Sequence, residues 1–330
     1  MADTKIEWAT KVWNPVRGCS PVSEGCRNCY AMKQAHRFSG PGKPYKGLTV
    51  IGPHGPRWNG KVRLVPEVLD APLHWRKPQR VFVDSMGDPF HEKVPPGFLR
   101  AMMQSALLAI KERGHTFIFI TKRAGRMLWY LNAEADTVFQ GYLAHEPRMQ
   151  FGVSVENQPT ADERIPKLLQ CPVATRIVSY EPSLGAVDFT QIQAGNLILN
   201  SLVYLRLFAE ESLSDLRRVD QIIAGGESGP GARPPHPDWF RSARDKCQDA
   251  RIPFFFKQWG EWAPVVRPLR YAHKGESTRL GFWDGDGNWR VGGDTAIPGE
   301  ILMNRVGKKA AGRLLDGREW NEYPKLGNRE

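Results

Sequence analysis

The chain has 330 residues, of which 41% are hydrophobic and 25% charged, which suits one large globular domain or a barrel with an appendage. No apolar run approaches the ~18 residues of a membrane helix, and the N-terminal residues lack the apolar core of a secretory signal, so we expect a cytoplasmic, reducing setting. Five cysteines, an odd number, argue against a disulfide framework, and a net charge of +11 makes an anionic partner plausible.

The first predicted strand lies around Val12–Val16 and leads into three closely spaced cysteines, Cys19, Cys26 and Cys29. Three thiolates on one loop can hold a [4Fe–4S] cluster by three irons and leave the fourth iron open to a substrate or cofactor. Two other readings stay open: a zinc site with His36 or another fourth ligand, or structural or redox thiols. Cys171 and Cys247 stand alone beside helix-like sequence, which favours burial as small hydrophobic residues.

After a segment rich in Gly, Pro and basic residues, at 37–76, short apolar runs recur, and each ends in a polar cluster. Continuous β-branched and aromatic runs bounded by turns are typical of strands buried on both faces. The expected strands are Arg80–Asp84, Thr116–Ile120, Gln150–Val155, Thr175–Ser179, Gln221–Ala224 and Pro253–Phe256.

Helical sequence separates several of these runs, as at Pro96–Arg113 and Pro237–Ala250. Such alternation predicts an α/β fold with six or seven parallel strands, a (β/α) barrel that is incomplete. We expect the barrel to occupy residues 1–262, with 37–76 as an insertion after the first unit. Polar residues follow the strands at the edge where such barrels build active sites: Asp88, Lys122, Glu156, Glu181, Glu227 and Lys257.

The pattern changes from residue 263 onward. Gly281–Val291 predicts a hairpin around a D-G turn, and Lys308–Leu315 predicts a short helix. We interpret 263–330 as a C-terminal extension that packs on the barrel and not as an independent domain.

Several motifs, taken together, resemble the radical S-adenosylmethionine superfamily of (β/α) barrel (TIM barrel) enzymes. More closely, the chain is similar to a phage- and prophage-associated family of uncharacterised proteins in that fold group, from Trp8 to about Pro324. The motifs are W-N-P-V-R-G-C-S at Trp13–Ser20, G-C-R-N-C-Y at Gly25–Tyr30, D-S-M-G-D-P-F-H at Asp84–His91, T-K-R at Thr121–Arg123, G-V-S-V-E at Gly152–Glu156, S-Y-E-P at Ser179–Pro182, A-G-G-E-S at Ala224–Ser228, F-F-K-Q-W-G at Phe255–Gly260 and L-D-G-R at Leu315–Arg318.

The resemblance implies that Cys19, Cys26 and Cys29 ligate three irons of a [4Fe–4S] cluster, whose fourth iron is chelated by S-adenosylmethionine. One-electron reduction by an external donor would then yield a 5′-deoxyadenosyl radical that abstracts a substrate hydrogen. Such a radical needs an enclosed, dry site.

The resemblance also implies roles for the polar strand ends. We expect Tyr30 near the cofactor, Ser85 or Asp88 near its methionine end, Lys122 at its carboxylate, and Ser154 and Glu156 near its ribose. We expect Glu181, Gly225, Gly226, Glu227 and Lys257 to contact either cofactor or substrate.

The basic balance, the 11 tryptophans and the phage association favour nucleic acid or a nucleotide as the substrate. A generally basic surface with tryptophans in the core explains the composition equally well, because Lys and Arg are spread along the chain. Two alternatives remain: a zinc-containing, non-catalytic nucleic-acid-binding protein, and hydrolytic chemistry that uses Asp88, His91 and the strand-end carboxylates. The sequence does not indicate whether a partner protein takes part.

Overall fold

The computed structural model of the chain describes residues 4–53, 55–134, 137–206, 216–265, 280–291 and 299–326. At its centre lies a sheet of seven parallel strands in the order β1-β6-β7-β8-β9-β14-β15, so neighbours in the sheet follow one another along the chain. The strands are β1 (Lys11–Trp13), β6 (Arg80–Val83), β7 (Thr116–Thr121), β8 (Met149–Val155), β9 (Thr175–Tyr180), β14 (Gln221–Gly225) and β15 (Phe254–Gln258).

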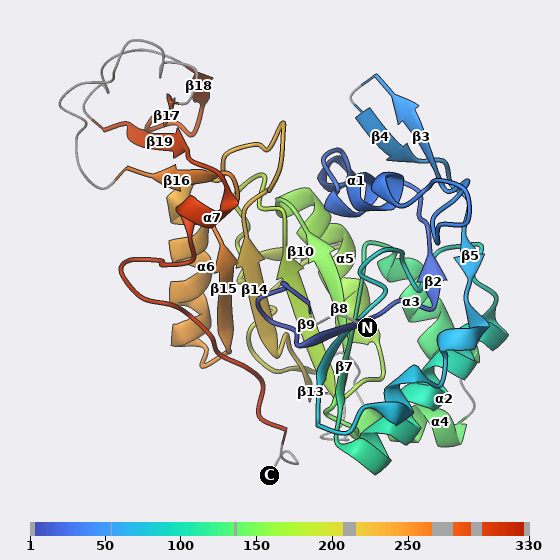
Figure 1. Cartoon of the computed structure of the whole chain (residues 1–330). Helices are drawn as coiled ribbons and strands as arrows, with labels where there is room; N and C mark the ends of the chain where they lie inside the picture. The colour runs from blue at the N-terminus through green and yellow to red at the C-terminus, as the bar shows by residue number, and fades with distance from the viewer. Residues whose placement is uncertain are drawn as a thin grey trace.

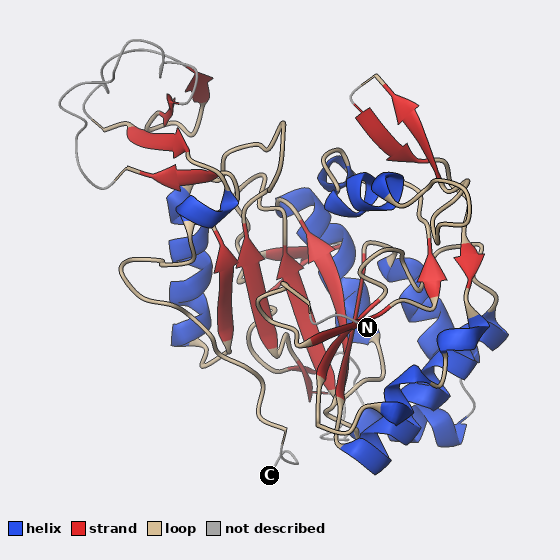
Figure 2. Ribbon diagram, in the orientation of Figure 1, coloured by secondary structure: helices blue, strands red, loops and turns tan. Residues whose placement is uncertain are grey.

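The sheet curls into a half-barrel, as Figures 1 and 2 show, and no hydrogen bonds join β1 to β15 within the described ranges. The predicted incomplete (β/α) barrel is therefore confirmed, and each predicted strand matches an observed one to within two residues, except the first. The predicted Val12–Val16 strand divides into β1 and β2 (Val16–Arg17), because Asn14 and Pro15 interrupt the ladder.

Helices cover the convex face of the sheet (Figure 2). They are α2 (Pro96–Arg113), α3 (Ala124–Trp129) with a π-helical turn at Tyr130–Glu134, α4 (Thr137–His145), α5 (Gln158–Gln170) and α6 (Pro237–Asp249). Helix α2 begins with a proline and ends at Gly114, which adopts φ 68° and so accommodates the left-handed cap. Between β9 and β14 the described residues form two small antiparallel pairs, β10 (Ile192–Ala194) with β11 (Leu197–Leu199) and β12 (Leu205–Arg206) with β13 (Leu216–Arg217).

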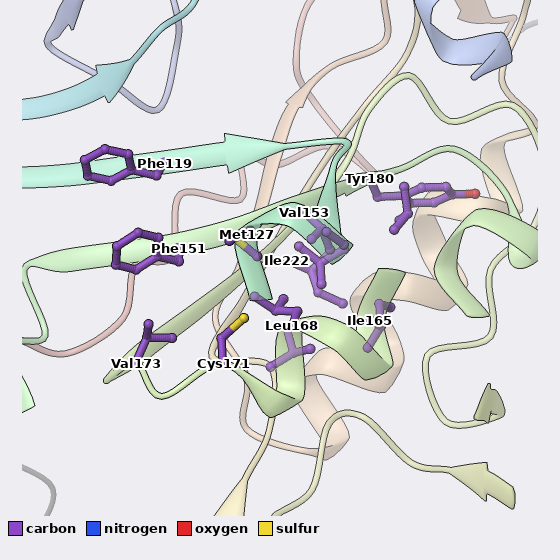
Figure 3. Close-up of a cluster of buried hydrophobic side chains, with 14 of the residues drawn as sticks. Phe119, Met127, Phe151, Val153, Ile165, Leu168, Cys171, Val173, Tyr180 and Ile222 are labelled. Carbon is purple, nitrogen blue, oxygen red and sulfur yellow. The ribbon is translucent and has the colours of Figure 1, made fainter. Parts of the chain in front are cut away.

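The main hydrophobic core lies between the sheet and these helices (Figure 3). Phe119 and Phe151 stack on neighbouring strands with ring centroids 5.1 Å apart, and Leu168 from α5 is fully buried with them. Cys171 and Cys247 are both buried in this core, as expected.

A second, smaller apolar cluster lines the concave face. Its strand residues are Phe82, Ile118, Ile120, Ile177, Ile223 and Phe255. The N-terminal segment crosses this face and adds Ile6, Trp8 and Ala9 to the cluster. The interior of the half-barrel is therefore filled at its base by packed side chains.

The insertion at 37–76 follows α1 (Tyr30–Arg37) and contains ordered elements. They are the hairpin β3 (Thr49–Gly52) with β4 (Gly55–Trp58), the strand β5 (Arg63–Leu64), which pairs with β2, and 3-10 turns at Pro66–Val68 and Ala71–His74. Tyr45, Leu48 and Trp58 form a small core with α1, and the cysteine loop packs against it. Figure 1 shows α1, β3 and β4 beside the C-terminal ends of the strands.

The C-terminal extension forms a four-stranded antiparallel sheet in the order β16-β19-β17-β18. Its strands are β16 (Trp262–Pro264), β17 (Leu280–Trp283), β18 (Trp289–Val291) and β19 (Ile301–Arg305), and the paired β17 and β18 confirm the predicted hairpin. The helix predicted at Lys308–Leu315 is shorter than expected: α7 covers Lys308–Ala311, because Gly312 leaves the helical region with φ 68° and ψ −158°. The following chain returns to β15, where Asn321 bridges to Phe255.

Within the described ranges, no helix combines the length and the apolar character that a bilayer span requires.

Candidate functional site

A cavity of about 260 Å³ opens at the C-terminal edge of the half-barrel, and the three clustered cysteines line it. Its floor is apolar and includes Trp8, Phe82 and Ile120. Twelve of the residues predicted for the site line this one cavity: Cys19, Cys26, Cys29, Tyr30, Ser85, Asp88, Lys122, Ser154, Glu181, Gly226, Glu227 and Lys257. Glu156 and Gly225 do not line the cavity, but each lies against a residue that does: Glu156 against Lys122, and Gly225 against Glu181.

The cysteine loop is held close to the second sheet strand. The backbone N–H of Val16 donates to Oδ1 of Asp84 at 2.9 Å, and Gly18 forms a parallel bridge with Gly87. A Cβ on Gly87 would come within 2.5 Å of the Val16 carbonyl oxygen, so only glycine permits this approach. A short 3-10 turn at Glu24–Cys26 then brings the chain to α1, whose N-cap is Cys29.

All three cysteines are free thiols of intermediate exposure. Burial raises the pKa of Cys19 to about 12; the charge of Asp88 adds to this rise, and Arg123 opposes it. Burial likewise raises the pKa of Cys29. Both thiols are therefore protonated at neutral pH, and binding of a cationic metal group would release protons, as metal sites of this kind do.

The described residues contain no group of three or more His, Cys, Asp or Glu side chains arranged for a metal ion. This absence concerns sites for a single metal ion. A zinc ion holds each thiolate sulfur about 2.3 Å from itself, so the ligand atoms must lie almost in van der Waals contact with one another. In a cluster each thiolate takes a different iron, and the sulfurs stand farther apart. His36, considered as a fourth zinc ligand, lies within hydrogen-bond distance of Thr49 and does not line the cavity.

Asp88, in the loop that follows β6, anchors the start of the cysteine loop through Arg123. The Arg123 guanidinium donates to Asp88 at 2.8 Å and to both the carbonyl and the hydroxyl oxygen of Ser20, at 3.0 and 2.8 Å. The same Nη1 lies 3.6 Å from Sγ of Cys19. Thr121 also donates to Asp88, so this carboxylate is fully engaged within the protein.

Glu156, 1% exposed, anchors the middle of the loop. Its Oε1 accepts from Ser23 at 2.9 Å and from Lys122 at 2.6 Å, while Arg164 of α5 donates to Oε2 at 3.1 Å. Burial opposes ionisation, yet the charges of Lys122 and Arg164 lower the pKa of Glu156 below its usual value. A Cβ on Gly25 would meet the Glu156 carboxylate at 2.4 Å, so the loop lies directly on it.

Glu227 anchors the end of the loop. Asn28 donates to its Oε2 at 2.9 Å, and Arg233 donates to both carboxylate oxygens, at 2.7 and 3.0 Å. Arg233 also donates to the carbonyl oxygen of Glu24 at 3.0 Å, so one guanidinium joins two segments of the site. Although burial opposes it, Arg233 lowers the pKa of Glu227.

One ion pair of the cavity makes no side-chain hydrogen bond to the cysteine loop within the described part of the chain. Lys257 of β15 donates to Oε2 of Glu181 at 2.6 Å, and both side chains are largely buried in the cavity wall. Gly225 lies behind this pair, where a Cβ would come within 3.2 Å of the Glu181 carboxylate. Ser154 and Ser179 complete this side of the cavity.

Two cavity residues were missed by reasoning from the sequence. Asp84 lines the cavity with Oδ2 buried and unpartnered among the described residues, and Trp8 does so with Nε1. Asp84 also adopts φ 56°, a strained value for a residue other than glycine. Burial raises its pKa well above the usual range. The D-S-M-G-D run was a signal for Asp84, whereas no local pattern distinguishes Trp8.

No curated protein and no solved structure matches the chain. The sequence model of one family, described as "Protein of unknown function (DUF5131)", matches residues 3–324. Because the match covers almost the whole sequence, the chain belongs to the DUF5131 family.

Proposed function

We propose that this protein is a radical S-adenosylmethionine enzyme that uses a [4Fe–4S] cluster. The observation that carries the proposal is the placement of Cys19, Cys26 and Cys29: one loop brings all three thiols to the cavity at the C-terminal edge of a parallel half-barrel. An open (β/α) barrel places its reactive groups at this edge. Three cysteine ligands leave one iron of a cubane for another molecule to bind.

When bound, the cluster would pass one electron from an external donor to S-adenosylmethionine, whose reductive cleavage would yield methionine and, with a hydrogen atom taken from the substrate, 5′-deoxyadenosine. In this chain Cys19, Cys26 and Cys29 would hold the three irons. All three are free thiols, which fits loading in a reducing cytoplasm, where thiols stay available.

The polar strand ends divide into two groups in this proposal. Asp88, Glu156 and Glu227 act as positioning residues, because their carboxylates already hold the cysteine loop. Asp88 does so through Arg123, Glu156 directly through Ser23, and Glu227 through Asn28 and Arg233. Their contribution is to fix the ligand loop, as residues that hydrogen-bond to metal ligands do at metal sites. The direct cofactor contacts expected for Lys122 and Glu156 stay predictions beside this positioning role.

The residues of the second group line the cavity and have polar side chains. Ser85, Ser154, Glu181 and Lys257 are available to orient the cofactor and the substrate, and Oδ2 of Asp84 can bind a donor of either molecule. The apolar base formed by Trp8, Phe82 and Ile120 restricts water, which suits a reactive radical. Hydrolytic chemistry is less well supported, because His91 does not line the cavity and instead contacts Ser20.

The test begins with protein purified without oxygen and reconstituted with iron and sulfide. We expect about four irons per chain and 5′-deoxyadenosine after addition of S-adenosylmethionine and a one-electron reductant. Cys19→Ala should lose the chromophore and the product. Cys171→Ala, which removes a core thiol outside the cavity, is the matched control and should retain both.

Three results would count against the proposal. Cluster assembly without any cleavage of S-adenosylmethionine would reject the enzymatic step. Zinc at one per chain, with no iron–sulfur absorption, would favour the non-catalytic nucleic-acid-binding alternative. Full activity of Cys19→Ala would favour hydrolytic chemistry.

A further inference from the structure

The positive charge of the chain is concentrated in one segment. Between Glu24 and Glu67 the sequence contains eight Lys or Arg residues and no Asp or Glu, against a net charge of +11 for the whole chain. Lys and Arg occur along the whole chain, and this segment differs from the rest because it contains no acidic residue. The eight residues, which we call the basic insertion surface, are Arg27, Lys33, Arg37, Lys43, Lys46, Arg57, Lys61 and Arg63.

These charges are accessible and unneutralised. All except Lys33 are exposed, and no described carboxylate lies within ion-pair distance of any of the eight. The polar contacts that the side chains make are with backbone carbonyl oxygens, as when Arg63 donates to Pro44 and Lys46. A surface with positive charge and no acidic residue favours a polyanion, because no local repulsion opposes the phosphates.

The basic insertion surface adjoins the mouth of the cavity. Tyr30 and Ala31 of α1 and Trp58 of β4 line the cavity, and α1 packs against β3 and β4. Tyr30 is 48% exposed, with its hydroxyl fixed on the Ser85 carbonyl oxygen at 2.7 Å. Phe38, at the other end of α1, is also exposed. Exposed rings among cations are the elements that bind unpaired bases by stacking.

We propose that the basic insertion surface docks a single-stranded nucleic acid and delivers one of its nucleotides to the cavity. The strand must be unpaired, because a cavity of about 260 Å³ cannot admit a duplex, and only an unpaired nucleotide can reach its mouth. The delivery step rests on the proposed function, since the receiving cavity is the one assigned to radical chemistry. Docking itself depends only on the surface.

The experiment uses the full chain with its cluster reconstituted and measures the fluorescence anisotropy of labelled 20-nucleotide DNA and RNA oligonucleotides of one sequence. The test variant combines Lys43→Gln, Lys46→Gln and Lys61→Gln, three exposed positions whose side chains make no polar contact with the residues that the structure describes. The matched control combines Lys77→Gln, Lys111→Gln and Lys325→Gln, equally exposed but near the N-terminal ends of the strands or in the tail. Both variants have the same net charge.

If the three lysines contact phosphates, the slope of log affinity against log salt should decrease by about 2, and affinity at 0.1 M salt should fall by about 10- to 100-fold. The control should retain the wild-type affinity and slope. The DNA and RNA arms identify the natural strand. Equal losses in the two variants, no binding by the wild type, or equal affinity for a blunt duplex would each overturn the proposal.

The same samples, given S-adenosylmethionine and reductant both with and without the oligonucleotide, separate this inference from the proposed function. Selective loss of binding with no 5′-deoxyadenosine would retain docking and reject the radical enzyme. Formation of 5′-deoxyadenosine with unselective or absent binding would retain the radical enzyme and reject docking.

Discussion

Replacing Glu156 with Gln removes the carboxylate that Lys122 and Arg164 share behind the cysteine loop. Glu156 is 1% exposed, and the side chains of Lys122 and Arg164 are 18% and 3% exposed, so the variant leaves two poorly hydrated cations without their common counter-charge. Breaking one buried ion pair destabilises a protein by about 3–5 kcal/mol. We expect Glu156→Gln to lower the free energy of unfolding by this amount, a large share of the ~5–15 kcal/mol typical of a domain.

The assay is urea denaturation of the metal-free protein followed by circular dichroism, with iron content after reconstitution as a second readout. Glu163→Gln is the matched control, because Glu163 lies on the same helix and contacts Arg164 and Lys167 at 3.6 Å but is 55% exposed. Its loss should cost about 0–1 kcal/mol and leave iron loading unchanged. If the two variants were equally stable and loaded equal iron, the anchoring role of Glu156 would be refuted.

Three further predictions concern the cavity. Arg123→Gln should lower the reduction potential of the reconstituted cluster, because the guanidinium places a positive charge 3.6 Å from Cys19 Sγ, and Arg123→Lys should partly restore the potential. In a redox titration, each ~1.4 kcal/mol of lost stabilisation of the reduced state equals about 59 mV. An unchanged potential would contradict the contact. Because the folded pKa of Asp84 is raised, wild-type stability should fall as pH rises from the ordinary value of 3.8 through the folded pKa, by up to about 1.4 kcal/mol per pH unit. Asp84→Asn should lack this component, so parallel stability curves from pH 4 to 9 would disprove the burial argument. Lys257→Met and Glu181→Gln should be less destabilising together than the sum of the single changes, with a coupling of about 0.5–3 kcal/mol; strict additivity in urea denaturation would show that the 2.6 Å pair is not formed in solution.

Local patterns in the sequence were sufficient for the architecture. Runs such as Thr116–Ile120 are buried on both faces of the sheet, and their recurrence between helices indicates parallel strands, whose C-terminal ends must meet at one edge. That rule alone brings Lys122, Glu181 and Lys257 to the cavity that Cys19 also lines. These conclusions need only sequence patterns that lie within single strands and helices.

Only the tertiary structure decided which polar groups hold the cysteine loop and which face the cavity. Asn28 contacts Glu227 across 199 positions, and Arg233 reaches Glu24 across 209. No periodicity encodes such pairs, because they depend on the curl of the sheet and on the path of a loop. The same holds for Asp84, which adopts φ 56° and whose Oδ2 is buried without a hydrogen-bond partner among the described residues. The sequence by itself determined the edge at which the site lies, and the fold determined which atoms are available there.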